Sequence, residues 1–154
     1  MDLVESLRLI AAKFDEEGID YALCGGLAMA VYAMPRGTLD IDLLIEERSL
    51  DRANQTLRVL GFEPTGVPME FQSGKVFISR FRRIDCESGR VVVLDLVHVS
   101  AANSEAWKGR CDVEWEGSRL KVVSPQGLIL LKSLRQSGQD QDDIEYLRGI
   151  TDED

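Results

Sequence analysis

The stretch that decides the fold covers residues 24–45 and reads CGGLAMAVYAMPRGTLDIDLLI. Its two glycines, Gly25 and Gly26, follow a short apolar segment that is typical of a strand. Residues 27–34 are rich in helix formers and stop at a proline, which predicts a short helix. Residues 38–45 alternate in a way that predicts a strand with an acidic face. We therefore expect a strand, a glycine turn, a helix and an acidic strand in direct succession.

The acids of that last strand are Asp40 and Asp42. Residues two apart on a strand project from the same side, with Cα atoms about 6.5–7 Å apart. Two carboxylates placed there repel each other, and a divalent cation relieves the repulsion. Mg²⁺ binds a few carboxylate oxygens together with substrate phosphate oxygens, and two such ions about 3.5–4 Å apart can hold both oxygens of a phosphoryl transfer. The pair predicts a site for one or two Mg²⁺ ions, and a solvated strand face is the alternative.

The glycine pair lies where a phosphate could bind. A Gly-Gly turn between a strand and a helix lets backbone N–H groups approach a phosphate, and the helix N-terminus favours negative charge. The strand that ends at Cys24 is expected to neighbour the acidic strand, so that a triphosphate can bridge the turn and the metals. A plain tight turn is the alternative for Gly25 and Gly26 taken alone.

Asp95 is the candidate for a third carboxylate. It interrupts the apolar run VVVLDLV at residues 91–97. A charge inside such a strand is costly unless it is paired or bound to a metal. Asp95 alone could face water at the end of a strand, but the order of turn, helix, acidic strand and second acidic strand favours the functional interpretation.

Three further side chains are weaker candidates for binding phosphate. Arg36 and Thr38 come just before the acidic strand, where a guanidinium could reach a phosphate, although a surface arginine is the alternative. Lys132 lies in an apolar helix and either reaches a triphosphate or extends to solvent. His98 follows Asp95 by three residues, so it should face the other side of the sheet and have a structural role.

Net charge restricts the class of partner. With 18 Lys and Arg against 27 Asp and Glu, the formal net charge is −9, which argues against broad nucleic-acid binding. One basic cluster is present, which we expect to be a solvated strand face or, alternatively, a contact for an RNA acceptor. Its members are Lys75, Arg80, Arg82 and Arg83.

Composition also predicts where the protein works. No run of about 18 apolar residues is present, so no membrane span is expected, and the acidic start is unlike a signal peptide. Three cysteines cannot all pair within one chain and none lies in a CxxC pattern, so we expect reduced thiols, no zinc site and a cytoplasmic location. They are Cys24, Cys86 and Cys111.

The motif of Gly25-Gly26, thirteen residues and then Asp40-Ile41-Asp42 resembles that of the nucleotidyltransferase superfamily. The string PRGTLDIDLLI at residues 35–45 is similar to the branch that contains the AbiEii-type abortive-infection toxins, and VVSPQGLILLK at residues 122–132 is similar to the helical end of that branch. The resemblance covers most of residues 5–148. A departure is Gly26, which stands where many members have a serine that contacts phosphate.

The resemblance implies a polymerase-β-like fold and a reaction. Asp40, Asp42 and Asp95 would hold Mg²⁺, Gly25 and Gly26 would contact the triphosphate, and Asp95 would help to deprotonate the acceptor hydroxyl. The activity implied is transfer of a nucleoside monophosphate from an NTP to a hydroxyl acceptor with release of pyrophosphate. A toxin–antitoxin or phage-defence setting is also implied. A catalytically inactive relative that binds a nucleotide or a partner is the alternative.

The whole chain is expected to form one α+β domain with a small mixed sheet and flanking helices. Residues 1–123 would form the core and residues 124–150 a helical segment packed on it. Because the chain is shorter than the toxin relatives, a partner protein or a second copy could supply the surface that grips the acceptor, and that acceptor could be RNA, a protein or a small molecule. Helices are predicted around 3–17, 50–60, 124–135 and 140–147, strands at 75–81 and 90–99, a hairpin at 111–123 and a loop at 63–74.

Overall fold

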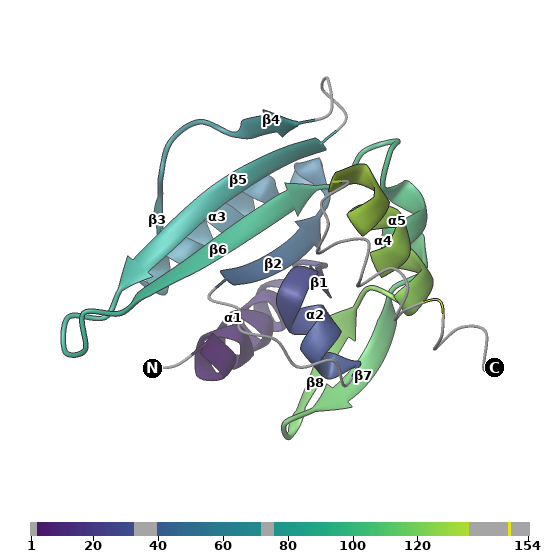
Figure 1. The fold of residues 1–154 in the computed structure, drawn as a ribbon. Coiled ribbons are helices and arrows are strands. Elements are labelled where there is room, and N and C mark those ends of the chain that lie inside the picture. Colours follow the sequence, from purple (N-terminus) through teal and green to yellow (C-terminus); the bar gives the residue numbers. More distant parts are fainter. Residues whose placement is uncertain (1–2, 33–39, 72–75, 136–147, 149–154) are drawn as a thin grey trace.

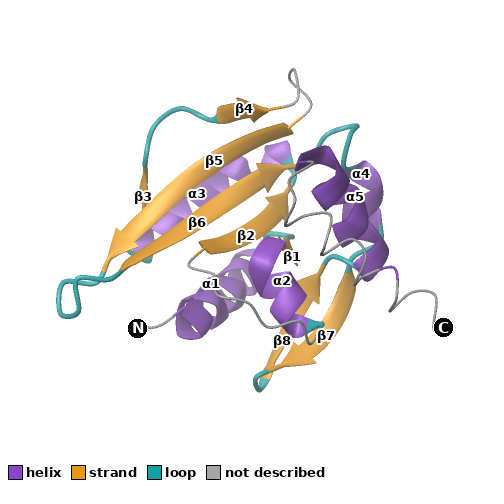
Figure 2. Cartoon of the chain, in the orientation of Figure 1, coloured by secondary structure: helices purple, strands orange, loops and turns teal. Residues whose placement is uncertain are grey.

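The computed structural model describes residues 3–32, 40–71, 76–135 and 148 (Figure 1). Within these residues the fold is α+β, with one eight-stranded mixed sheet flanked by helices (Figure 2). This confirms the predicted fold class. None of the helices in the described part of the chain is long and apolar enough to cross a membrane.

The centre of the sheet holds the strands that carry the predicted acids. Strand β1 (Ala22–Cys24) runs antiparallel to β2 (Asp40–Ile45), so the two are neighbours as predicted. Strand β2 runs parallel to β6 (Val91–His98), which forms an antiparallel hairpin with β5 (Val76–Ile84). The strand order is β3-β5-β6-β2-β1-β8-β7, with β4 paired to β5. The remaining strands are β3 (Glu63–Pro64), β4 (Met69–Phe71), β7 (Cys111–Trp115) and β8 (Ser118–Val122).

Two helices cover one face of this sheet. Helix α3 (Leu50–Val59) lies behind the central strands in the view of Figure 1, and helix α1 (Leu3–Glu17) contacts both α3 and β2. The buried residues of α1 include Leu7, Ile10 and Phe14, which follow the predicted helical spacing. The side chains of β2 and β6 that alternate with the acids are fully buried, so this face forms the main core; they are Ile41, Leu43, Ile45, Leu94 and Leu96.

The other helices frame the opposite face. Helix α2 (Gly25–Val31) follows β1 without a loop and starts two residues earlier than predicted. Helix α5 (Pro125–Arg135) confirms the prediction for that segment and contacts α4 (Ser104–Lys108). We did not predict α4, because five residues are too few to show a helical period. The helix predicted at 140–147 lies outside the described residues.

One predicted loop is wrong in part. The segment 63–74 contains β3 and β4, which both pair with β5. Its prolines and glycines are typical of loops, yet an edge strand tolerates a proline such as Pro64 because one side of it needs no hydrogen bonds. Strand β5 also extends beyond the predicted end at residue 81, because its pairing with β6 continues to Ile84 and Val91.

Candidate functional site

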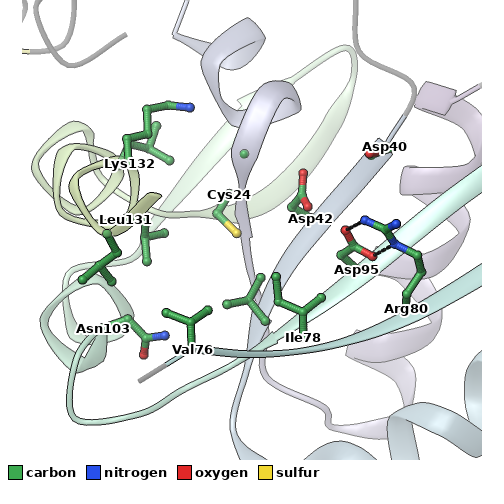
Figure 3. Close-up of a pocket in the computed structure, with 14 residues that line it drawn as sticks. Cys24, Asp40, Asp42, Val76, Ile78, Arg80, Asp95, Asn103, Leu131 and Lys132 are labelled. Atoms are coloured by element: carbon green, nitrogen blue, oxygen red, sulfur yellow. Dashed lines mark hydrogen bonds and ion pairs between the residues drawn. The ribbon is translucent and has the colours of Figure 1, made fainter. Parts of the chain in front are cut away.

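A pocket of about 500 Å³ opens at the end of β1, where the chain enters α2 (Figure 3). Its polar lining comes from residues far apart in the sequence, and its apolar lining comes from β5, β6 and α5. The lining residues at the polar part are Gly25, Asp40, Asp42, Arg80, Asp95 and Lys132.

Sheet register explains why these residues meet. Cys24 is paired with Asp42, Asp42 with Asp95, and Asp95 with Arg80, so the four residues form one row across four strands. Asp40 lies two residues before Asp42 and projects from the same face of β2. The structure thus brings the three predicted acids to one face of the sheet and one pocket. Their roles in binding or catalysis stay predictions.

Asp95 is held by an arginine. Nε of Arg80 donates to one carboxylate oxygen of Asp95 at 2.8 Å, and Nη2 donates to the other at 2.9 Å. The Asp95 side chain is only 6% exposed, whereas the Arg80 side chain is 43% exposed. A two-point contact of this kind fixes the plane of the carboxylate. The charge inside the apolar strand is therefore paired, and its orientation is set from the neighbouring strand.

Gly25 leaves no room for a side chain beside Asp42. Its φ of +68° lies in the left-handed region that glycine adopts readily. A Cβ at this position would lie 2.8 Å from Cγ of Asp42 and would overlap its carboxylate. The glycine is needed for both the turn and the close approach to the acid.

Burial and neighbouring charges act on the ionisable groups at this end of the pocket. Burial raises the pKa of the Asp40 carboxyl above its ordinary value, the charge of Asp95 adds to this, and Arg80 opposes it. The hydrogen bonds to Asp95 raise the pKa of Arg80, so its guanidinium stays charged. A bound cation would relieve the repulsion that Asp40 experiences.

Lys132 reaches the pocket from α5. Its residue exposure is 3%, which excludes the alternative that the side chain extends to solvent. Figure 3 places Lys132 on one side of the pocket and the Arg80–Asp95 pair on the other. An ammonium at this place can contact an anionic group that enters near Gly25.

The carboxylates suit magnesium only in combination with a substrate. Among the described residues, no group of three or more His, Cys, Asp or Glu side chains is arranged to hold a metal ion by itself. Mg²⁺ however keeps several waters and needs one or two carboxylates plus phosphate oxygens. Asp40 and Asp42 fit that requirement, because they offer oxygen ligands on one face beside a corner where no Cβ fits.

The other residues singled out in the sequence are not among the described residues that line this pocket. Arg36 and Thr38 lie outside the described residues, and Gly26 is the second residue of α2 rather than part of the described pocket lining. His98 faces away from Asp95, as expected: its Nε2 is 2.8 Å from Oγ of Ser79 and burial lowers its pKa.

The predicted basic cluster is not one surface. Arg80 binds Asp95, whereas Arg83 lies on the other face of β5, where it donates to Oγ of Ser6 at 2.8 Å and stacks over Phe62. Strand alternation separates residues 80 and 83, so neighbours in sequence face opposite sides. Lys75 lies outside the described residues.

Two features of the pocket were not predicted from the sequence. One is the pairing of Arg80 with Asp95. The register of the β5–β6 hairpin places these two opposite charges directly across from each other, and a correct prediction of that register would have found the pair. The other is an apolar part of the pocket, formed by Val76, Ile78, Val97, Leu128, Leu131 and Leu134.

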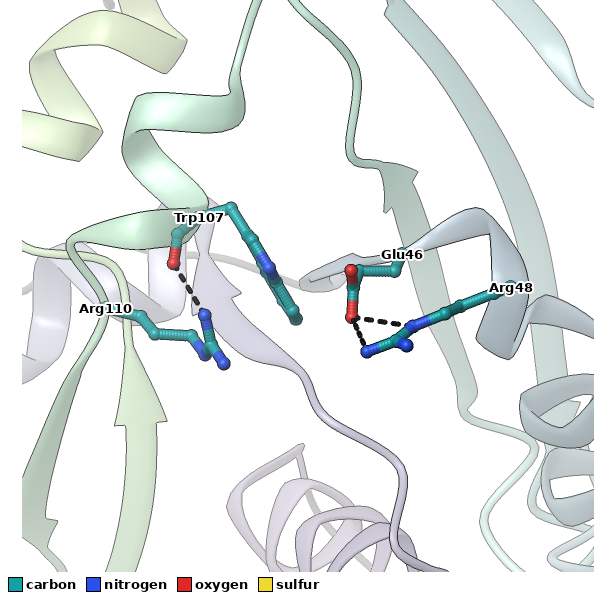
Figure 4. Close-up of polar contacts among 4 residues, drawn as sticks. All are labelled: Glu46, Arg48, Trp107 and Arg110. Carbon is teal, nitrogen blue, oxygen red and sulfur yellow. Dashed lines mark hydrogen bonds and ion pairs between the residues drawn. The ribbon is translucent and has the colours of Figure 1, made fainter.

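A second pocket of about 250 Å³ lies elsewhere, and its cations contact neighbouring groups: Lys108 pairs with Glu105, Lys121 with Asp112 and Arg110 with Trp107. The guanidinium of Arg110 lies 4.0 Å from the ring centroid of Trp107, and its Nη1 donates to the Trp107 backbone oxygen at 2.9 Å (Figure 4). Nearby, Arg48 donates to Glu46 at 3.0 Å. We therefore place the candidate site in the larger pocket; the smaller one is lined by Lys108, Arg110, Cys111, Asp112 and Lys121.

Comparison with solved structures shows which known fold the chain has. The lincosamide antibiotic adenylyltransferase LnuA, in its lincomycin-bound structure, matches with a TM-score of 0.66 and 17% identity over 97% of this chain and 98% of that chain. The chain has the nucleotidyltransferase fold. The antibiotic-resistance factor ANT(2'')-Ia matches with a TM-score of 0.60 and 16% identity over 99% and 94% of the two chains. A Thermotoga maritima protein assigned as a nucleotidyltransferase matches with a TM-score of 0.58 and 16% identity, also over 99% and 94%.

At these identities the likeness concerns the fold alone. No family model matches the chain, and no curated protein matches it in sequence. The nucleotidyltransferase fold agrees with the resemblance drawn from Gly25, Gly26, Asp40 and Asp42, whereas the comparison does not extend to the AbiEii-type branch.

Proposed function

We infer that this protein is a Mg²⁺-dependent nucleotidyltransferase that moves a nucleoside monophosphate from an NTP to a hydroxyl group of an acceptor. The observation that carries the proposal is the row in which Asp42 and Asp95 are direct neighbours on parallel strands, with Asp40 on the same face. The nucleotidyltransferase fold of the chain supports it.

Each residue of the polar part has a proposed task. Asp40 and Asp42 would hold Mg²⁺, which when bound neutralises charge on the transferring phosphoryl group. The bare backbone at Gly25 and the ammonium of Lys132 would bind the triphosphate on the β1 side of the pocket. Asp95 would orient the acceptor hydroxyl and share in the metal site.

In the proposed reaction one phosphorus–oxygen bond forms and one breaks. The acceptor oxygen forms a bond to the α-phosphorus while the bond from that phosphorus to its bridging oxygen breaks, and pyrophosphate leaves. Asp95 takes the hydroxyl proton, since it is the acid farthest from β1 in the row. Arg80 is a positioning residue, because it acts through Asp95 by fixing the direction of that carboxylate.

The test is transfer of label. The purified chain is incubated with Mg²⁺, each of the four NTPs labelled at the α-phosphate, and an extract of small molecules, RNA and protein. We expect label to move from one or more NTPs into an acceptor fraction with wild-type protein and not with Asp42→Asn. Label that stays in the NTP with every fraction, at concentrations where binding is measured, would overturn the enzymatic proposal.

One observation favours a second candidate, an inactive nucleotide-binding protein. Both carboxylate oxygens of Asp95 are already engaged by Arg80. If Arg80 keeps this contact when NTP binds, Asp95 has less capacity to take a proton. Binding of Mg²⁺ and NTP without transfer of label to any fraction would support this candidate over the first.

A toxin–antitoxin or phage-defence setting, implied by the resemblance of residues 35–45 to AbiEii-type toxins, is a separate proposal. It predicts that induced expression of the chain stops the growth of a bacterial host and that Asp42→Asn does not. Normal growth at equal expression of both proteins would contradict it without affecting the proposed chemistry.

A further inference from the structure

The pocket has a polar part and an apolar part, and only the polar part is used by the proposed reaction. The apolar part is lined from β5 and β6 by Val76, Ile78 and Val97 and from α5 by Leu128, Leu131 and Leu134. Figure 3 shows Val76, Ile78 and Leu131 around the pocket, with Asp95 beyond Ile78. Apolar side chains that line an open pocket are suited to binding an apolar portion of a ligand.

Sheet register places this apolar part directly next to Asp95. Ile78 pairs with Val97 in the row that follows the Arg80–Asp95 row on the same face of the hairpin. Successive rows on one face of a sheet are separated by about 6.5–7 Å along the strands. A molecule whose hydroxyl contacts Asp95 therefore extends over Ile78 and Val97 within a few bond lengths.

The direction of attack decides which reactant occupies that part. In phosphoryl transfer the attacking and leaving oxygens lie roughly in line with the phosphorus. Gly25 belongs to the β1 side of β2, and Asp95 belongs to the opposite, β6 side. If pyrophosphate leaves on the β1 side, the acceptor arrives from the β6 side, where the Ile78–Val97 pair lies.

Charge limits what the acceptor can be. The charged lining residues that the structure describes are three acids assigned to the reaction and two cations, Arg80 and Lys132. The described carboxylate nearest Ile78 and Val97 is Asp95, whose two oxygens both accept hydrogen bonds from Arg80, so an ammonium placed beside the pair would lose hydration and compete with Arg80 for a partner. A polycationic acceptor is thus disfavoured at the apolar part.

Nucleic acid fits this pocket poorly as well. Its backbone requires several cations along a surface, whereas the net charge is −9 and Arg83 of the predicted basic cluster faces the other side of β5. The described lining residues include no aromatic ring on which a base could stack.

We propose that the acceptor is a small hydroxyl compound that carries an aliphatic portion next to the reacting hydroxyl and has no more than one positive charge. This inference rests on the proposed function, because it assigns the acceptor side from the direction of nucleotidyl transfer. It names the substrate class of the pocket from the Ile78–Val97 pair beside Asp95.

The experiment uses three probes with the full chain, Mg²⁺ and a non-hydrolysable NTP analogue. They are n-hexyl β-D-glucoside, the polycationic aminoglycoside neomycin, and a short single-stranded RNA, with methyl β-D-glucoside as the matched control for the hexyl chain. Binding is followed through the NMR signals of isoleucine and valine methyl groups. We expect the hexyl glucoside to shift the signals of Ile78 and Val97 and to bind at least about tenfold more tightly than the methyl glucoside.

Two variants of β5 test the place of binding. Ile78→Lys should weaken binding of hexyl glucoside at least about tenfold, because it puts an ammonium in the apolar part. Ile84→Lys is the matched control, since Ile84 is on the same strand but exposed at its far end, and it should change binding less than about twofold. If Ile78→Lys fails to fold, Ile78→Ala replaces it, with a several-fold loss expected.

The outcomes separate the two proposals. Tighter binding of neomycin or RNA than of hexyl glucoside, with shifts at Ile78 and Val97, would overturn the inference. Equal binding of hexyl and methyl glucosides would also overturn it. Transfer of label to neomycin or RNA but to no neutral hydroxyl compound would overturn the inference and leave the proposed function intact. Selective binding of hexyl glucoside without transfer to any acceptor would support the class of ligand while the proposed function fails.

Discussion

The two faces of the central strands carry different kinds of residue: one carries buried apolar side chains and the other carries acids that line a pocket. On the face towards α1 and α3, residues such as Leu43 and Leu94 are fully buried and fill the core. On the other face, Asp42 and Asp95 are the adjacent residues along the same strands, and they line an open pocket. Substitutions on the first face should therefore change stability, and those on the second should change ligand binding and transfer.

Asp95→Asn tests the pocket face and should have the largest effect. Asparagine keeps the size of the side chain but cannot take a proton, so kcat for nucleotidyl transfer should fall by about 10²–10⁴-fold. The measurement is the initial rate of pyrophosphate release with the acceptor found in the labelling experiment. An activity close to wild type would show that Asp95 does not accept the proton.

Leu94→Ala tests the core face one residue away. Loss of a fully buried leucine should lower the free energy of unfolding by about 2–5 kcal/mol. Chemical denaturation measures this change, and the rate per folded molecule should stay close to wild type. If Leu94→Ala reduced the rate of the folded protein as much as Asp95→Asn does, the division between the two faces would be wrong.

Gly25→Ala tests the turn between β1 and α2, beside the pocket face. A Cβ there overlaps the carboxylate of Asp42, and a φ of +68° strains any residue other than glycine. We expect a loss of about 1–3 kcal/mol in stability together with a loss of Mg²⁺–NTP binding.

The matched control is Gly18→Ala. Gly18 has a φ of +69°, but a Cβ added to it would have no atom within 4 Å, so the variant carries the same backbone strain without the overlap. It should lose stability and retain binding. Equal binding by the two variants would show that the contact between Gly25 and Asp42 does not matter.

Arg80→Met tests how the pocket face is organised. Removal of the two hydrogen bonds to Asp95 should lower kcat by roughly 10–100-fold with a smaller change in the KM for NTP, as for other groups that orient a reacting residue. Arg80→Lys should recover only part of the rate, because an ammonium cannot make the two-point contact. Arg82→Gln is the control on the same face and should behave like wild type. An increase in rate for Arg80→Met would indicate that Arg80 blocks Asp95.

His98→Gln should have the smallest effect and concerns the core face. Burial lowers the pKa of His98, so the unfolded chain binds its proton more tightly than the folded chain does. Stability should therefore fall as the pH drops below the ordinary histidine value of about 6.5, and it should be regained as the pH rises. His98 is the sole histidine of the sequence, so His98→Gln should flatten this part of the pH profile of urea unfolding. An unchanged pH profile in His98→Gln would show that protonation of His98 does not cause the loss of stability at low pH.

The acidic row could be predicted from the sequence because strand alternation is a local rule. Asp40 and Asp42 share a face by spacing alone, and Asp95 was found because a charge stands out in an apolar strand. The partner of Asp95 could not be predicted, because it depends on the register of a hairpin whose ends are not marked by a tight turn sequence.

The short elements and the apolar part of the pocket could not be predicted from the sequence, for two different reasons. Helix α4 and strands β3 and β4 are too short to show a period, and they form because longer neighbours offer pairing or packing. The apolar part joins β5 and β6 to α5, and a leucine such as Leu131 looks in sequence like any core residue. Its exposure to a pocket follows from tertiary packing alone.

The most direct measurement is the thermal unfolding midpoint of the wild type and Asp42→Asn, each with and without Mg²⁺ and a non-hydrolysable NTP. If the acidic row binds the metal and triphosphate, ligand at about 100 times its Kd should stabilise the wild type by about 2.7 kcal/mol and raise its midpoint by several degrees. Asp42→Asn should show no such rise. A wild type that does not respond to any NTP with Mg²⁺, or a variant that responds equally, would contradict the central claim.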